Sequence, residues 1–397
     1  MNLHAQQAPD PAALQTVRRV LRESPLIDGH NDLPWEFRKL ASNRLDTIDL
    51  NKDTSSFGLV TDLPRLKAGE VGGQFWSVYV PADLTNGAAV TAVLEQIDLV
   101  HRMIARYPQS LELALTADDI VRIHREGKIA SLIGMEGGHS IGNSLGALRM
   151  MYALGARYMT LTHTSNNDWA DSATDTPAHH GLTPFGEDVV REMNRLGMLV
   201  DLSHVSDDTM RAALRISKAP VIFSHSSARA LCHHVRDVPD DVLKLIPANG
   251  GIVMVTFVPE YLTEPDREDE VAVTAERKRL AKLYPGDDAR IKEAVADWRK
   301  TLPDPRKATL LDVADHIDHV RAVAGIDYVG IGSDYEGFHN PPAGLEDVSC
   351  YPALLAELLR RGYSEEDIKK VAGQNLLRVL RAAEQTARQL QASHSSD

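Results

Sequence analysis

The stretch Leu26–Asp32, LIDGHND, joins a short apolar run to side chains that can bind a metal or carry a proton. The run Leu26–Asp28 predicts a buried strand, and His30 and Asp32 follow it two residues apart. Alternate residues of an extended chain point to the same side, so both side chains can face one site. The same unit, a strand that ends on such residues, recurs along the chain.

Seven further short runs are rich in Val, Ile and Leu. Most are continuously apolar, which is typical of strands buried on both faces of a parallel sheet. They are Gly73–Val80, Ala130–Met135, Tyr158–Thr162, Met198–Leu202, Val221–Ser224, Gly251–Phe257 and Tyr328–Gly332.

Amphipathic segments between these runs repeat apolar residues at three- and four-residue spacing, which predicts helices. Gly197 and Gly325 stand where two of them should end, and Ser206 is a suitable N-cap for a third. The predicted helices are Ala88–Tyr107, Phe185–Leu196, Ser206–Ile216 and Leu310–Ala324, with another after the capping box of Ser364 and Asp367.

Eight strands alternating with helices predict an α/β fold, a (β/α)8 TIM barrel, within the 397 residues of the chain. No Pro-, Gly- or Ser-rich linker divides the sequence, so we expect residues 1–397 to form one domain. The segment 259–305 is too long for a plain connection. Its charged stretches AERKRLAKLY and ARIKEAVADWRK predict a helical insertion before the eighth strand.

The composition excludes several classes of partner. A formal net charge of −13 argues against nucleic acid or an anionic membrane surface as the main partner, because both require basic patches. No apolar stretch is long enough to span a bilayer, and the termini resemble neither a signal peptide nor a lipid-anchor signal. We expect a cytoplasmic protein without a membrane anchor, whose two cysteines, Cys232 and Cys350, are free thiols.

Barrel enzymes place their active sites at the C-terminal ends of the strands, and six of the eight runs end on residues suited to chemistry. By chance, eight strand ends would carry fewer than one of the 16 histidines. The residues are His30 and Asp32 after the first run, Glu136 after the third, His163 after the fourth, His204 after the fifth, His225 after the sixth and Asp334 after the eighth.

These residue types predict a metal site with two ions. His nitrogens and carboxylate oxygens are the usual ligands of hydrolytic zinc. His30 and Asp32 can hold one ion, and His204 and His225, from neighbouring strands, can hold the other. Glu136 is the natural bridge, since no Lys follows a strand. Two metals about 3.5–4 Å apart would share a water and lower its pKa, which makes a barrel of the metallo-dependent hydrolase type the expected architecture.

Each of these histidines alone could be an ordinary hydrogen-bonded residue; their convergence favours metal binding. We expect His139 to lie beside the site rather than to be a ligand. His316 and His319 lie three apart on one face of the helix before the last strand, and we expect them on the surface. The other candidates are expected in solvated loops or at most to line the site: His179, His180, His233 and His234.

From about Ser24 to Leu380, the sequence resembles the membrane (renal) dipeptidases, peptidase family M19. The resemblance rests on seven motifs in combination. They are IDGHND (residues 27–32), MEG (135–137), LTHTSN (161–166), DLSHVS (201–206), FSHSSA (223–228), RDVPDD (236–241) and GIGSD (330–334).

The resemblance implies the same ligand set, with His30 and Asp32 on one zinc, His204 and His225 on the other, and Glu136 between them. It adds three roles. His163 would contact the oxyanion of the tetrahedral intermediate, and Arg236 would hold the terminal carboxylate of the substrate. Asp334 would accept the proton of the attacking water and pass it to the leaving amine. Mn²⁺ or Co²⁺ could replace Zn²⁺ in such a site, and a homodimer is expected.

The expected activity is hydrolysis of L-Xaa-L-Xaa and L-Xaa-D-Xaa dipeptides by a hydroxide that bridges the metals. The segment Val255–Val258 lacks the tyrosine that some family members use for the substrate carboxylate, and the sequence leaves open whether Tyr261 replaces it. Two alternatives also remain open. The same site could serve a binuclear amidohydrolase that acts on another amide or a lactone, or the chain could be a catalytically inert binding protein.

Overall fold

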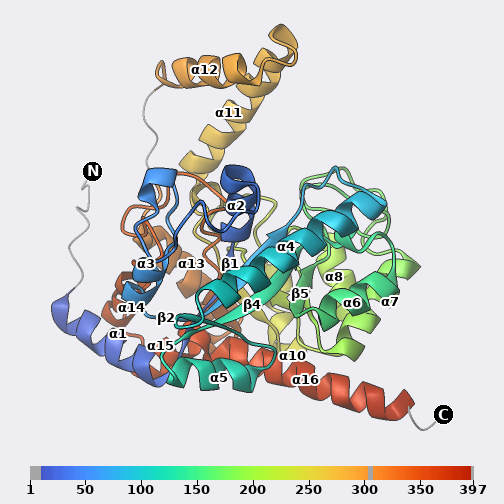
Figure 1. The fold of residues 1–397 in the computed structure, drawn as a ribbon, viewed down its shortest axis with the longest axis vertical. Helices are drawn as coiled ribbons and strands as arrows, with labels where there is room; N and C mark the ends of the chain where they lie inside the picture. Colours follow the sequence, from blue (N-terminus) through green and yellow to red (C-terminus); the bar gives the residue numbers. More distant parts are fainter. Residues whose placement is uncertain (1–9, 303–306, 395–397) are drawn as a thin grey trace.

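Parallel strands form a closed barrel in the computed structural model, which describes residues 10–302 and 307–394 (Figure 1). The strand order around the barrel is β2-β1-β9-β8-β7-β6-β5-β4, and the pairing of β4 with β2 closes the ring. The barrel strands are β1 Leu26–Asn31, β2 Val71–Tyr79, β4 Ile129–Glu136, β5 Ala156–Thr160, β6 Leu199–Asp201, β7 Ile222–Phe223, β8 Ile252–Val255 and β9 Val329–Ile331. Each overlaps one predicted run, so the predicted TIM barrel is confirmed.

One further strand, β3 (Leu111–Leu113), lies outside the closed ring. It pairs in parallel with the first residues of β4, Ile129–Ser131, while β5 pairs with the last ones. The sequence analysis missed β3 because three residues are too few to show a periodicity.

Helices surround the barrel on the outside (Figure 1). The α-helices are α1 Pro11–Glu23, α2 Leu33–Ala41, α3 Leu63–Ala68, α4 Asn86–Arg106, α5 Ala117–Arg125, α6 Leu145–Ala153, α7 Pro184–Leu196, α8 Asp207–Ile216, α9 Asp240–Leu243, α10 Ile246–Asn249, α11 Glu264–Leu283, α12 Asp288–Arg299, α13 Leu310–Val323, α14 Tyr351–Arg360, α15 Glu365–Lys369 and α16 Asn375–His394. Shorter helical turns are η1 Ser55–Phe57, η2 Gly138–Ile141, η3 Pro259–Tyr261, η4 Ile326–Tyr328 and the π-helical η5 Lys370–Gln374.

The caps predicted from the sequence are present. The Ser206 hydroxyl accepts a hydrogen bond from the Thr209 amide at 3.2 Å, and Gly197 ends α7 with a positive φ of 86°. Ser364 and Asp367 form the reciprocal capping box at the start of α15. These caps fix where the helices between the strands begin and end.

Helices α11 and α12 fill most of the segment between β8 and α13, and they project away from the barrel (Figure 1). They pack on each other through a small apolar cluster that includes Leu280, Ile291 and Val295. The end of the predicted insertion, residues 303–305, lies outside the described residues.

The expectation that His316 lies on the surface is wrong. Its side chain is fully buried, because this face of α13 packs against β8, β9 and the loops that follow β7 and β8. Nδ1 accepts the Ala228 amide hydrogen at 3.0 Å, and Nε2 lies 3.0 Å from the Leu262 carbonyl oxygen. Both ring nitrogens are therefore used to hold two loops. His319 is partly exposed and pairs with Asp240 at 2.7 Å.

Both cysteines are free thiols, as predicted, with Cys232 buried and Cys350 partly exposed. Among the helices of the described ranges, none combines the length and the apolar character that a membrane crossing requires.

A glycine inside the barrel positions one wall of the site. A Cβ atom added to Gly134 of β4 would lie 2.0 Å from the ring of Tyr158 on β5. The Tyr158 hydroxyl in turn lies 2.7 Å from Nδ1 of His30 on β1. The absence of a side chain at position 134 therefore lets the tyrosine cross the barrel interior and reach the end of β1.

We expect Gly134→Ala to lower the free energy of unfolding by about 1–3 kcal/mol, because the new methyl group overpacks the barrel against a ring that has no room to move. Gly87→Ala is the matched control, since Gly87 lies in α4 with open space around its Cα. The free energy of unfolding of the control should equal that of the parent protein or exceed it by up to about 1 kcal/mol, because alanine favours a helix more than glycine does. Urea denaturation of both variants measures this, and equal stabilities would contradict the packing described here.

Candidate metal centre

The structure gathers the residues predicted for the metal site at the C-terminal ends of the barrel strands. His30 lies at the end of β1 and Asp32 follows it as the N-cap residue of α2. Glu136 is the last residue of β4. His163, His204, His225 and Asp334 follow β5, β6, β7 and β9. Parallel strands end at one face of a barrel, which is why residues far apart in the sequence meet here.

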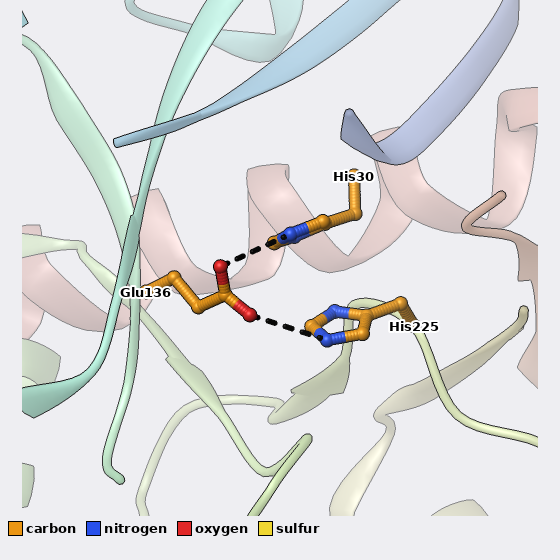
Figure 2. Close-up of side chains that lie close together, drawn as sticks. All are labelled: His30, Glu136 and His225. Carbon is orange, nitrogen blue, oxygen red and sulfur yellow. Dashed lines mark ion pairs between the residues drawn. The ribbon is translucent and has the colours of Figure 1, made fainter. Parts of the chain in front are cut away.

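Glu136 lies at the centre of this group (Figure 2). Its Oε2 is 3.5 Å from Nε2 of His30. Its Oε1 is 3.0 Å from Nε2 of His204 and 3.6 Å from Nε2 of His225. The Ser77 hydroxyl donates to Oε2 at 3.0 Å and holds the carboxylate in this orientation. The two oxygens of one carboxylate thus face two different sets of donors.

The first set contains the residues that follow β1 and β9. Nε2 of His30 is 3.4 Å from Oδ2 of Asp32 and 3.9 Å from Oδ1 of Asp334. The second set contains His204 and His225, whose Nε2 atoms are 3.0 Å apart. His163 adds a nitrogen 3.5 Å from Oε1 of Glu136. The assignment of His30 and Asp32 to one ion and of His204 and His225 to the other stays a prediction, because His30 and His225 also form one group of candidate ligands with Glu136.

The residues present fit divalent metal ions. Nε2 of His30 and Oδ1 of Asp32 are buried and have no hydrogen-bond partner within the described ranges. A mixed set of imidazole nitrogens and carboxylate oxygens is typical of zinc, and it also suits manganese or cobalt. Within the described residues, three overlapping groups have ligand atoms close enough to hold an ion: His30, Glu136 and His225; Glu136, His163 and His204; and His30, Asp32 and Asp334.

Three carboxylates converge here without an ion pair to any Lys or Arg of the described residues: Asp32, Glu136 and Asp334. Burying unpaired charges of this kind costs several kcal/mol per group, so a buried carboxylate needs a counter-charge. Burial lowers the pKa of His30, but Tyr158, Glu136 and Asp32 outweigh it and raise that pKa well above the usual value, so this imidazole offsets part of the charge. Bound cations would supply the positive charge that the site still lacks.

Burial sets the protonation of the second donor set. It lowers the pKa of His204 and of His225 well below the usual value, and nearby positive groups such as Arg236 lower both further. Neutral imidazoles keep a lone pair for a metal.

Burial raises the pKa of Glu136, but His30 and His163 outweigh it and hold that pKa well below its ordinary value. Burial raises the pKa of Asp334 well above its usual range, although His30 opposes the rise.

Two site residues have unusual backbone conformations. His204 and Asp334 have positive φ angles of 70° and 69°, which few residues other than glycine adopt. The Asp334 amide donates to the His30 carbonyl at 3.1 Å and thereby joins the ends of β1 and β9. Gly337 packs against both acids, since an added Cβ would lie 2.4 Å from Oδ1 of Asp334 and 2.5 Å from Oδ2 of Asp32.

His163 lies on the open side of the group. Its side chain is 14% exposed, whereas His30 is 0% and His225 is 1% exposed. Its ring lies 4.8 Å from that of Tyr79 and 4.3 Å from that of His204, measured between centroids. A bound substrate could therefore reach His163. His139, by contrast, lies outside the group, with Nε2 3.1 Å from the Pro81 carbonyl oxygen.

Arg236 is a buried cation without a described ion-pair partner beside the second donor set. It is 1% exposed, and its hydrogen bonds, to the Ser226 hydroxyl and the His225 carbonyl, are long at 3.5 and 3.4 Å. The Nε atom has no partner among residues 10–302 and 307–394. The guanidinium carbon lies 5.4 Å from the ring centroid of Tyr261, so this tyrosine flanks the same position.

Several residues that shape the site escaped the sequence analysis. Tyr158 and Ser224 hydrogen-bond the outer nitrogens of His30 and His225, at 2.7 and 2.8 Å. The Ser224 hydroxyl donates a hydrogen bond to Asp201, and Gly337 packs against Asp32 and Asp334. Asp201 and Ser224 stand in the same motifs as His204 and His225, but spacing alone does not distinguish a ligand from its support.

Comparison with known proteins identifies the family of this chain. The model of the membrane dipeptidase family (peptidase family M19) matches residues 14–394. Dipeptidase 3 of Rattus norvegicus and that of Mus musculus are each 44% identical to this chain over 381 residues, 95% of this chain and 68% of each relative.

Solved structures agree as well. The probable dipeptidase PvdM from Pseudomonas aeruginosa has a TM-score of 0.82 at 28% identity, with 95% of this chain and 100% of that chain covered. A metallo peptidase from Rhodobacter sphaeroides, liganded with a phosphinate mimic of the dipeptide L-Ala-D-Ala, has a TM-score of 0.74 at 25% identity and coverage of 91% and 99%. The chain therefore belongs to the membrane dipeptidase family, peptidase family M19, and is a peptide-bond hydrolase.

Proposed function

We propose that this protein is a zinc-dependent dipeptidase that holds two Zn²⁺ ions on either side of Glu136. The observation that carries the proposal is the position of this carboxylate, whose two oxygens face separate histidine-containing donor sets at 3.0–3.6 Å. When bound, two such ions lower the pKa of a shared water and polarise the scissile carbonyl. The remaining chemistry is assigned to Asp334, His163 and Arg236.

Arg236 selects the substrate in this proposal. A guanidinium matches a carboxylate in two parallel hydrogen bonds, and Arg236 has no described ion-pair partner. A dipeptide carries a free carboxylate one residue beyond its single peptide bond, so its C-terminus fits Arg236 with Tyr261 alongside. The bound mimic of L-Ala-D-Ala in the Rhodobacter sphaeroides relative supports L-Xaa-D-Xaa substrates. We propose L-Xaa-L-Xaa dipeptides as substrates on the family resemblance.

Asp334 and His163 handle the proton and the developing charge. The raised pKa of Asp334 suits a group that accepts a proton from the attacking water and passes it to the leaving amine. His163, whose partly exposed side chain lies at the open side of the group, would donate a hydrogen bond to the carbonyl oxygen as it becomes negative.

The purified protein should contain about two zinc ions per chain, and chelation should abolish dipeptide hydrolysis until Zn²⁺ is returned. His204→Ala should lower the zinc content towards one ion or none, because it removes a nitrogen 3.0 Å from Glu136. His139→Ala is the matched control, since its ring lies beside the centre but bonds the Pro81 carbonyl instead. Elemental analysis measures all three proteins. An equal zinc loss in both variants, or a parent protein that takes up no zinc, would argue against this centre.

Arg236→Lys should reduce kcat/KM for a dipeptide by about 10- to 100-fold. The reason is the loss of a charge-assisted hydrogen bond to the substrate carboxylate, which contributes about 1.5–3 kcal/mol. The same dipeptide as its C-terminal amide is the control, because it lacks the carboxylate that Arg236 would hold. The parent enzyme should hydrolyse the amide poorly, and the variant should lose little further activity on it. A similar decrease in kcat/KM for the dipeptide and for its amide would mean that Arg236 does not bind the substrate carboxylate.

Asp334→Asn should lower kcat by about 10²- to 10⁴-fold through loss of the proton acceptor. Its zinc content should stay at the parent value, which separates proton transfer from metal binding. This distinction matters because Asp334 also lies 3.9 Å from His30. Loss of zinc in the variant would reassign Asp334 as a ligand.

A panel of L-Xaa-L-Xaa and L-Xaa-D-Xaa dipeptides, N-acyl amino acids, cyclic amides and lactones separates this proposal from the alternatives. Turnover of dipeptides supports it. Activity confined to the other amides or lactones would indicate a different amidohydrolase, and zinc-loaded protein inert towards the whole panel would indicate a binding protein.

A further inference from the structure

A buried hydrogen-bond chain lies behind His225, on the side away from Glu136. It runs from Asp201, the last residue of β6, through the hydroxyl of Ser224 to Nδ1 of His225. We infer that Asp201 and Ser224 are positioning residues that fix the tautomer of His225, so that its Nε2 presents a lone pair to the metal site. The inference rests on the metal binding proposed above and assigns a role to two residues outside the ligand set.

Asp201 is an acceptor surrounded by four donors. Its Oδ1 accepts the backbone amides of Ser203 at 3.1 Å and Ser224 at 2.9 Å. Its Oδ2 accepts the hydroxyls of Thr160 and Ser224, each at 2.6 Å. Asp201, Thr160, Ser203 and Ser224 are 0% exposed, so no solvent competes for these hydrogen bonds. The carboxylate is thereby held rigidly between β5, β6 and the residues after β7.

The donors around Asp201 determine where the Ser224 proton goes. A hydroxyl has a single hydrogen to donate, and a carboxylate can only accept. The Ser224 hydrogen therefore points to Asp201, and the oxygen offers a lone pair to Nδ1 of His225 at 2.8 Å. Nδ1 must then carry the ring hydrogen, which leaves Nε2 without one.

The choice of tautomer matters because of what Nε2 faces. It lies 3.0 Å from Nε2 of His204 and 3.6 Å from Oε1 of Glu136. A hydrogen on this nitrogen would occupy the place of a cation, whereas a lone pair would bind one. Nδ1 of His204 has no hydrogen-bond partner in the part of the chain that the structure describes. Within this histidine pair, the Ser224 contact to His225 is therefore the hydrogen bond that sets a tautomer.

The first donor set has a different support. Nδ1 of His30 bonds the hydroxyl of Tyr158, which also donates to the Gly29 carbonyl at 3.2 Å. Loss of the Ser224 hydroxyl should therefore affect one of the two metal positions and spare the other. A general loss of folding, by contrast, would weaken metal binding at both positions.

The test compares Ser224→Ala with Thr160→Val. Both variants remove one buried hydroxyl that donates to the same Asp201 oxygen at the same distance, but only Ser224 contacts the His225 ring. Zn²⁺ affinity is measured for the full chain by competition with a chromophoric chelator, with thermal unfolding as the folding check. Ser224→Ala should bind one of its two zinc ions about 10- to 100-fold more weakly, the usual cost of losing such a support. Thr160→Val should keep both affinities.

Unchanged affinity in Ser224→Ala, or an equal loss in Thr160→Val, would overturn the inference. A parent protein that binds no zinc would instead remove the proposed metal site itself, so the two failures are distinguishable. If Ser224→Ala does not fold, ¹⁵N chemical shifts of the His225 ring in the zinc-loaded parent protein decide the question. A hydrogen on Nδ1 supports the role of Ser224, and a metal bound through Nδ1 contradicts it.

Discussion

The constraint on which this structure depends is the burial of Asp32, Glu136 and Asp334 around one point without a Lys or Arg of the described residues to pair with them. Buried carboxylates that lack a counter-charge destabilise a fold, so bound cations would stabilise this arrangement. His204 and His225 cannot supply that charge, because burial lowers the pKa of each well below the usual value. Burial also lowers the pKa of His30, but Tyr158, Glu136 and Asp32 outweigh it and raise that pKa well above the usual value, so His30 can supply one positive charge against three carboxylates. Metal binding therefore completes the interior of the barrel as well as its chemistry.

The barrel brings the side chains of the site together, and contacts with neighbouring residues set their orientation. The strands end at one face, but an orientation such as that of His30 depends on Tyr158, which reaches it only because Gly134 has no side chain. Asp201 and Ser224 have the corresponding effect on His225. The outer ring nitrogens of His30 and His225 are thus each held by a hydroxyl group, which fixes the orientation of these two rings.

The sequence was sufficient to predict the barrel and the positions that its strands bring together at one face. Continuous apolar runs identify its strands, and a run that ends on His or Glu identifies a position at the catalytic face, as Glu136 and His225 illustrate. It failed where tertiary packing decides. His316 lies in the helix before the last strand, and only the loops after β7 and β8 bury it. Gly337 and Ser224 support the centre through contacts that no periodicity reveals. The roles proposed for His163, Arg236 and Asp334 come from family resemblance and geometry together.

The central claim is that Glu136 lies between two metal ions. Anomalous scattering measured at the zinc absorption edge, on crystals of the zinc-loaded protein, tests it directly. Two peaks are predicted, one beside His30 and Asp32 and the other beside His204 and His225, with a Glu136 oxygen next to each. A single peak, or a peak pair from which the Glu136 carboxylate is turned away, would contradict the account.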